Sequence, residues 1–163
     1  MIGDSSALAE ALGRFEGLYP DTIELSLGRV LNALELLGRP QDRLPPVIHV
    51  AGTNGKGSTC AFMRAMMEAA GLSVHVFTSP HLVRFNERIR LAGEIVDDAR
   101  LIDWLERTHD AIKGQEITQF EATTATALLA FSEVPADVLI LEVGLGGSYD
   151  ATNVIDQPAL SVI

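Results

Sequence analysis

The segment VAGTNGKGST, residues 50–59, combines glycines, a lysine and hydroxyl groups where an apolar run gives way to a helical pattern. Glycines at such a junction let the backbone turn tightly and point several N–H groups inward, which forms a nest for phosphate oxygens. Lys56 adds a positive charge that can reach the β and γ phosphates, and Ser58 or Thr59 offers a hydroxyl to a magnesium ion. The helix that follows directs its positive end at the same anion. The segment therefore predicts a nucleotide-binding loop, and one for ATP.

The expected nucleotide contacts lie at the start of that helix. They are Asn54, Gly55, Lys56, Gly57, Ser58 and Thr59. The common pattern G-x-x-x-x-G-K-[ST] is not met, because Val50 stands in place of its first glycine and Gly57 separates the lysine from Ser58. This departure argues against a P-loop kinase or GTPase. A glycine-rich turn that binds nothing is the other alternative, and the strand–loop–helix context argues against it.

Two further motifs each follow an expected strand. Residues 78–89 read TSPHLVRFNERI, and residues 141–147 read LEVGLGG, with DATNV at 150–154. Together with the glycine-rich loop, and in this order, they resemble the signatures of folylpolyglutamate synthases and dihydrofolate synthases. These belong to the Mur ligase superfamily of ATP-dependent enzymes that form amide bonds to amino acids. The resemblance runs from about Tyr19 to the last residue.

A magnesium site is expected beside the loop. Glu142 ends an apolar strand there, and its carboxylate is placed to hold Mg²⁺. The resemblance implies the same role for Glu142 and adds Ser79 as a second ligand, so that Ser58, Ser79 and Glu142 make up the expected metal site. Lys56 and Glu142 are the expected catalytic residues. A solvated acid at a strand end and a turn residue before a proline are the alternative interpretations of Glu142 and Ser79.

The resemblance also implies a pocket for a pterin. The aromatic face of Phe120 can stack on a flat heterocycle, and the carboxylate of Asp150 can accept its ring N–H groups. Without the resemblance, Phe120 is more simply a core aromatic residue. Ser148 stands where the family usually has arginine, and Ser26 where it usually has glycine. The expected substrate contacts are Leu25, Ser26, Leu27, Thr118, Gln119, Phe120, Glu121, Gly147, Asp150 and Ala151.

Composition excludes several classes of protein. The 163 residues are 47% apolar with a net charge of −10, which fits one compact α/β domain and argues against nonspecific nucleic-acid binding. The sequence has neither a signal-peptide pattern nor an apolar run long enough for a membrane helix, so we expect a cytoplasmic protein. Cys60 is the only cysteine and suits helix packing, with a reactive thiol as the alternative.

Several polar residues keep two interpretations open. His49 lies inside an expected strand and is more simply a core histidine than a base. His81 either contacts substrate or shapes its loop. Arg84, Arg88 and Arg90 form a basic cluster that either attracts a polyanionic substrate, such as a glutamate tail, or is a solvated face.

Alternating patterns predict the fold. Strands are expected at 47–50, 74–77, 138–141 and from 159, and helices at 5–17, 26–37, 58–70, about 97–112 and 121–131. Residues 79–96 read as a loop with a small hairpin around residues 88–93. We therefore expect a mostly parallel sheet flanked by helices, similar to the central ATP-binding domain of Mur ligases, with a helical segment at 1–45 and the P-loop core at 46–163. Because carboxyl ends of parallel strands meet at one edge, the three motifs are expected to share one site.

The expected function is that of an ATP-dependent ligase in folate biosynthesis. Such an enzyme adds L-glutamate to dihydropteroate or a folate through an acyl phosphate. The resemblance places a further metal ligand and a glutamate-binding domain after Ile163, so we expect part of a longer, monomeric enzyme that binds ATP without completing catalysis. Another Mur-type amino-acid ligase and a non-catalytic nucleotide-binding module are the alternatives.

Overall fold

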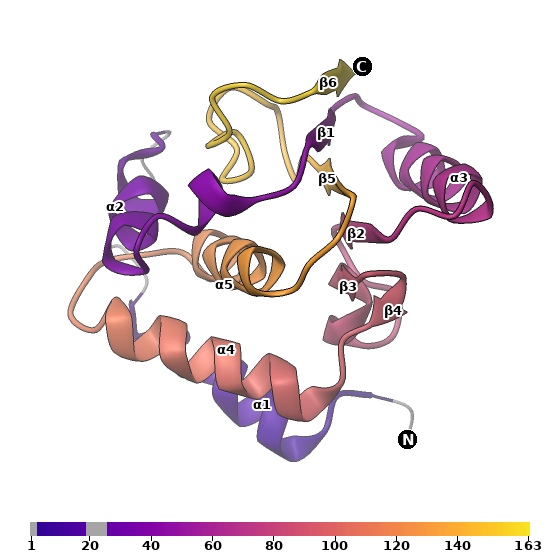
Figure 1. The fold of residues 1–163 in the computed structure, drawn as a ribbon. Coiled ribbons are helices and arrows are strands. Elements are labelled where there is room, and N and C mark those ends of the chain that lie inside the picture. Colours follow the sequence, from indigo (N-terminus) through magenta and orange to yellow (C-terminus); the bar gives the residue numbers. More distant parts are fainter. Residues whose placement is uncertain (1–2, 19–25) are drawn as a thin grey trace.

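The computed structural model describes residues 3–18 and 26–163. Within them, six strands form one sheet in the order β4-β3-β2-β5-β1-β6 (Figure 1). The strands are β1 (Val47–Val50), β2 (Val74–Phe77), β3 (Ile89–Leu91), β4 (Glu94–Ile95), β5 (Val138–Glu142) and β6 (Leu160–Val162). Neighbours among β2, β5, β1 and β6 are parallel, whereas β3 and β4 pair antiparallel at one edge. The expected mostly parallel sheet and its small hairpin are confirmed.

Helices cover both faces of this sheet. They are α1 (Ser6–Gly13), α2 (Gly28–Leu36), α3 (Lys56–Ala69), α4 (Asp98–Ala111) and α5 (Gln119–Glu133), with short 3₁₀ helices at Glu16–Leu18, Pro40–Arg43 and Phe85–Arg88. Figure 1 shows α3 alone on one side of the strands, while α5 lies against the other side with α4 and α1 beyond it. None of the helices in the described part of the chain is long and apolar enough to span a membrane.

Two helices begin earlier than their apolar patterns predict. α3 begins at Lys56 and not at Ser58, because Gly55 adopts a left-handed backbone conformation (φ 79°) and so ends the loop directly at the helix. α5 begins at Gln119, where Thr118 and Glu121 form a capping box. In both helices the polar residues of the first turn belong to the helix although they carry no apolar periodicity.

The strand β5 is the centre of the core. All five of its residues are buried, since β1 and β2 flank it and helices cover both faces. The larger core lies between the sheet and the layer of α1, α2, α4 and α5, and a smaller one lies beneath α3. α5 fits so closely because its buried side is rich in alanine and threonine.

The strand register brings the three motifs to one edge. Val50 at the end of β1 pairs with Glu142 at the end of β5, and Phe77 at the end of β2 pairs with Leu141. The chain leaves all three strands at this edge. The loops that follow them are therefore neighbours, as the strand–helix alternation predicts.

The buried His75 on β2 has both ring nitrogens engaged. Its Nδ1 accepts from the amide of Ala92 (3.0 Å), and its Nε2 lies 2.8 Å from the carbonyl oxygen of Val134. This arrangement suits the neutral ring with the proton on Nε2. Burial lowers the pKa of His75, against weaker opposing effects of its backbone contacts.

We predict that this histidine makes stability depend on pH. The unfolded chain binds the proton with a pKa of about 6.5 and the folded chain only at lower pH, so stability is full above that value and falls as the pH drops below it. Urea unfolding at about pH 7.5 and about pH 5.5 measures the loss. His75→Gln is expected to be less stable at the higher pH and to lose less on acidification. Equal losses in the two proteins would contradict the assignment.

Candidate functional site

The loop after β1 presents its backbone donors at the start of α3. Gly52 and Gly55 both have positive φ angles, 131° and 79°, which residues with a side chain rarely adopt. Gly55 is the N-cap and has no side chain to satisfy the free N–H groups of the first helical turn. These groups, with the positive end of a 14-residue helix, form a site for an anion. The residues named for the nucleotide, 54–59, all belong to this loop and first turn.

Lys56 is the first residue of α3, and its side chain contacts the backbone of the glycine-rich loop. Its Nζ donates to the carbonyl oxygen of Gly52 at 2.8 Å. The side chain is only partly exposed and lies near the negative charge of Glu142. The ammonium group is thus held at the nest, within reach of an anion bound there.

Glu142 connects the three strand ends. Its Oε2 accepts from the backbone amide of Ser79 at 3.1 Å, and a Cβ placed on Gly57 would lie 3.7 Å from its Oε1. The residue is 4% exposed. Burial raises the pKa of Glu142, while the amide of Ser79 and the charge of Lys56 act in the opposite direction. Only small backbone groups separate this carboxylate from the phosphate nest.

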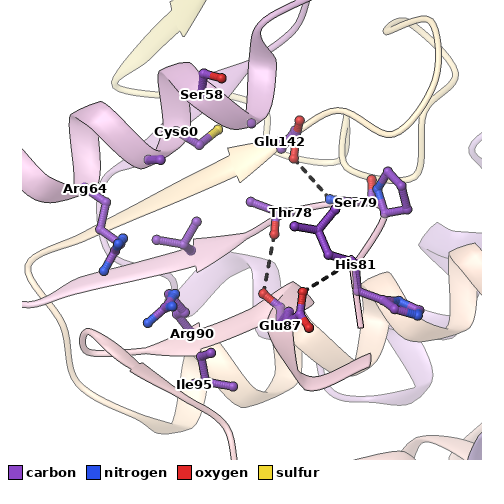
Figure 2. A pocket seen from close by; sticks show the side chains of 15 residues that line it. Ser58, Cys60, Arg64, Thr78, Ser79, His81, Glu87, Arg90, Ile95 and Glu142 are labelled. Atoms are coloured by element: carbon purple, nitrogen blue, oxygen red, sulfur yellow. Dashed lines mark hydrogen bonds between the residues drawn. The ribbon is translucent and has the colours of Figure 1, made fainter. Parts of the chain in front are cut away.

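A cavity of about 810 Å³ opens beside this carboxylate (Figure 2). α3 forms one wall, and β2, the β3–β4 hairpin and the loop after Ser79 form the others. Ser58, Thr78, Ser79 and Glu142 contribute oxygen atoms to its lining. Of the expected nucleotide contacts, Gly57 and Ser58 line this cavity together with the expected metal ligands, whereas residues 54–56 and Thr59 do not line it.

The oxygen donors suit a magnesium ion. Mg²⁺ is commonly bound through one or two carboxylates together with substrate phosphates and water. Within residues 3–18 and 26–163, no three His, Cys, Asp or Glu side chains gather closely enough to hold a metal ion by themselves. The site offers one carboxylate and nearby hydroxyls, which fits a metal bound jointly with a phosphorylated ligand.

Three of the expected pterin contacts line a second cavity of about 320 Å³. These are Thr118, Gln119 and Phe120, at the start of α5, and they are joined there by Phe85 and Arg88. The guanidinium carbon of Arg88 lies 4.9 Å from the centre of the Phe85 ring. The pocket thus offers aromatic surface and a cation to a flat ligand.

Two other expected substrate contacts, Glu121 and Asp150, form hydrogen bonds or ion pairs within the protein. Glu121 caps α5 through Thr118 and forms an ion pair with Arg29 of α2 at 3.2 Å. Asp150 accepts from the amides of Leu145 (2.9 Å) and Thr152 (3.0 Å). Both carboxylates are buried and shape the walls around the second cavity, which they do not line.

Among the described residues, the remaining expected substrate contacts do not line the cavity at the start of α5. Ala151 is 4% exposed and packs in the core, while the carbonyl of Gly147 accepts from the amide of Asp150. Leu27 is the N-cap of α2 and packs against the larger core, and Ser26 precedes it. Leu25 lies outside the described residues.

His49 and His81 each contact another side chain of the protein through a ring nitrogen. The Nε2 atom of His49 lies 2.9 Å from the hydroxyl of Thr152, which itself donates to Asp150 at 2.5 Å. The partly exposed His49 therefore belongs to a chain of polar contacts with the buried Thr152 and Asp150. His81 accepts from Nε of Arg88 at 2.9 Å, which ties its loop to the start of β3.

Cys60 is a packing residue. It is 1% exposed, and burial, followed by the charge of Glu142, raises the pKa of its thiol to about 12. The burial and the raised pKa favour the protonated thiol and the interpretation of Cys60 as a packing residue.

Gly144 and Arg64 are among the residues of the site that were missing from the sequence-based candidates. Gly144 lies between Phe120 and Asp150: a Cβ there would be 2.5 Å from Cζ of Phe120 and 3.1 Å from Oδ2 of Asp150. Arg64 lines the large cavity, seven residues after Gly57. Helical periodicity from Gly57 could have indicated Arg64, whereas nothing local marks Gly144 as a contact of Phe120.

We predict that Gly144→Ala disturbs the Phe120 side of the site. The added methyl group must displace the aromatic ring, and overpacking of this kind typically costs about 1–3 kcal/mol. Urea unfolding measures the change. Gly147→Ala is the matched control, because nothing lies within 4 Å of its added Cβ. Equal stabilities of the two variants would contradict the close contact.

No family model matches the chain. Over 93% of its length it is 42% identical to the dihydrofolate synthase/folylpolyglutamate synthase of Escherichia coli, and it spans only 36% of that protein.

Solved structures give the same result. The bifunctional folylpolyglutamate synthase/dihydrofolate synthase of Yersinia pestis, complexed with AMPPNP and a Mn ion, matches with a TM-score of 0.88 and 40% identity, covering 99% of this chain and 39% of that one. An FPGS–AMPPCP–folate complex matches with a TM-score of 0.86 and 36% identity, covering 94% and 39%. Over nearly its whole length, the chain is therefore similar to dihydrofolate synthase/folylpolyglutamate synthases, and it spans a little over a third of the length of such a protein.

Proposed function

We propose that this chain supplies the ATP-binding and metal-binding part of a ligase that adds L-glutamate to dihydropteroate or a folate. The observation that carries the proposal is the convergence of the start of α3, at Gly57 and Ser58, with Ser79 and Glu142 on one cavity. Similarity to proteins complexed with AMPPNP and Mn, and with AMPPCP and folate, supports it. The homologous enzymes extend well beyond the matched region. The complete reaction is thus assigned to a protein of which this chain is a part, and we expect that protein to be cytoplasmic and monomeric.

Amide formation from a carboxylate requires that the carboxylate be activated. Transfer of the γ-phosphoryl group of ATP to it gives an acyl phosphate and ADP, and attack by the amine of glutamate then releases phosphate. Catalysis of this kind rests mainly on positioning and on neutralising charge. In this chain the amides at the start of α3 bind the phosphates, and Lys56 stabilises negative charge on them.

Glu142, Ser79 and Ser58 would hold the magnesium ion. The metal supplies positive charge that neutralises the phosphates when it is bound. The buried position of Glu142 excludes water around its carboxylate and strengthens its interactions with a cation. The backbone amide of Ser79 keeps one carboxylate oxygen oriented.

The pteridine is assigned to the smaller cavity at the start of α5. Phe120 and Phe85 offer apolar surface for a flat ring, and Gln119 and Thr118 offer polar groups at its edge. The ion pair between Glu121 and Arg29 fixes this end of α5. A substrate held there can extend its carboxyl end past Phe120 and Gly144 toward Glu142, because Gly144 lies two residues after Glu142 and touches Phe120.

We predict that Lys56→Ala weakens binding of ATP by about tenfold or more, since a charge-assisted contact contributes roughly 1.5–3 kcal/mol. Titration calorimetry with Mg²⁺ and a non-hydrolysable ATP analogue measures the affinity. Lys113→Ala is the matched control, because Lys113 is exposed and follows α4, away from the cavity. Unchanged affinity in the Lys56 variant, or an equal loss in both variants, would contradict the assignment.

A further inference from the structure

The large cavity has a second charged end. Figure 2 shows Arg64 of α3 and Arg90 of β3 pointing into the same part of it, away from the hydrogen bond between Ser79 and Glu142. One end of the cavity therefore carries the Glu142 carboxylate with Gly57 and Ser58 of α3, and the other end carries two guanidinium groups. The nucleotide and metal groups assigned above occupy only the first end.

Both guanidinium groups are held in place with donors left over. Arg64 uses Nη1 to contact the carboxylate of Glu68, one helical turn away, at 3.2 Å. Arg90 donates from Nη1 to the carbonyl oxygen of Gly93 at 3.0 Å. Among the described residues, no carboxylate lies within 4 Å of the Arg90 side-chain nitrogens. Because an arginine has five N–H groups, each side chain can still donate to a ligand in the cavity.

The surroundings favour an added negative charge. Burial lowers the pKa of Arg90, and the nearby charge of Arg64 lowers it further, against opposing effects of Glu68 and Glu94. An anion placed between the two arginines would relieve their repulsion. Glu87, the other acid in the lining, is occupied by the backbone amides of Leu82, Val83 and Arg84.

We propose that Arg64 and Arg90 form a subsite for the carboxylate groups of a γ-linked glutamyl tail. The inference rests on the proposed function and names where the tail of a polyglutamylated substrate or product lies. Two planar guanidinium groups suit carboxylates, which they can bind through paired hydrogen bonds.

The cavity walls favour a glutamyl chain over a compact anion. Ala61, Val76 and Ile95 line the space around the two arginines and offer apolar surface to methylene groups. A glutamyl residue carries two methylenes between its linkages and a free α-carboxylate, so it matches both the walls and the charges. Inorganic phosphate matches only the charges.

The test uses the 163-residue chain and a γ-linked triglutamate peptide as the probe. Nuclear magnetic resonance follows the side-chain Nε–H signals of the arginines during the titration, with inorganic phosphate as the comparison ligand. We expect saturable shifts of Arg64 and Arg90, binding about tenfold weaker or more in the Arg64→Gln/Arg90→Gln variant, and a weaker response to phosphate. Arg100→Gln and Arg107→Gln on α4 are the controls, since both side chains are exposed outside this cavity.

Several results would overturn the inference. They are the absence of saturable shifts, equal affinity in the double variant, or tighter binding of phosphate than of the peptide. If the double variant does not fold, the affinity for the peptide is compared between the wild-type chain and the single variant Arg64→Gln. Binding of the ATP analogue is measured on the same samples. If the wild-type chain binds the analogue but not the peptide, only this inference fails, whereas failure to bind the analogue contradicts the proposed function itself.

Discussion

Val50 and Glu142 are paired in the parallel register of β1 and β5, two neighbouring inner strands of the sheet. This single alignment places an acidic residue at the level where the glycine-rich loop begins. A shift of one residue would turn Glu142 toward the opposite face of the sheet. The rest of the site depends on this register, because Ser79, Gly57 and Lys56 all approach the same carboxylate.

The carboxylate of Glu142 is buried, and this burial determines how strongly it interacts with neighbouring charges. A buried charge is costly unless it is paired or hydrogen-bonded, and in this protein Glu142 has one backbone amide and the nearby Lys56 as partners. The same features that make an ionised Glu142 costly in the free protein make it a strong ligand for a cation. Because Gly57 has no side chain, the start of α3 can approach the carboxylate of Glu142. Because Gly144 has none either, the ring of Phe120 on α5 can pack against the backbone there. Close packing of backbone against side chains thus joins the start of α3 to the aromatic part of the candidate site.

Much of this arrangement could be predicted from the sequence. The strand–helix alternation, the edge shared by the three motifs and the hairpin at residues 88–93 follow from local patterns that the structure confirms. Contacts between distant residues could not be predicted in this way. The ion pair between Arg29 and Glu121 and the chain from His49 through Thr152 to Asp150 depend on how α2, α5 and the last loop pack together. The resemblance to a family named Asp150 and Glu121 as substrate contacts, and their buried hydrogen bonds give both a structural role as well.

We propose that the ends of β1, β2 and β5 build one nucleotide-dependent metal site. Anomalous diffraction from crystals of this chain grown with Mn²⁺ and a non-hydrolysable ATP analogue tests it most directly, because it locates the ion without assumptions about ligands. We expect an anomalous peak next to Glu142, between Ser58 and Ser79, that disappears in crystals of Glu142→Gln grown in the same way. A bound nucleotide with the ion elsewhere, or an unchanged peak in the variant, would contradict it.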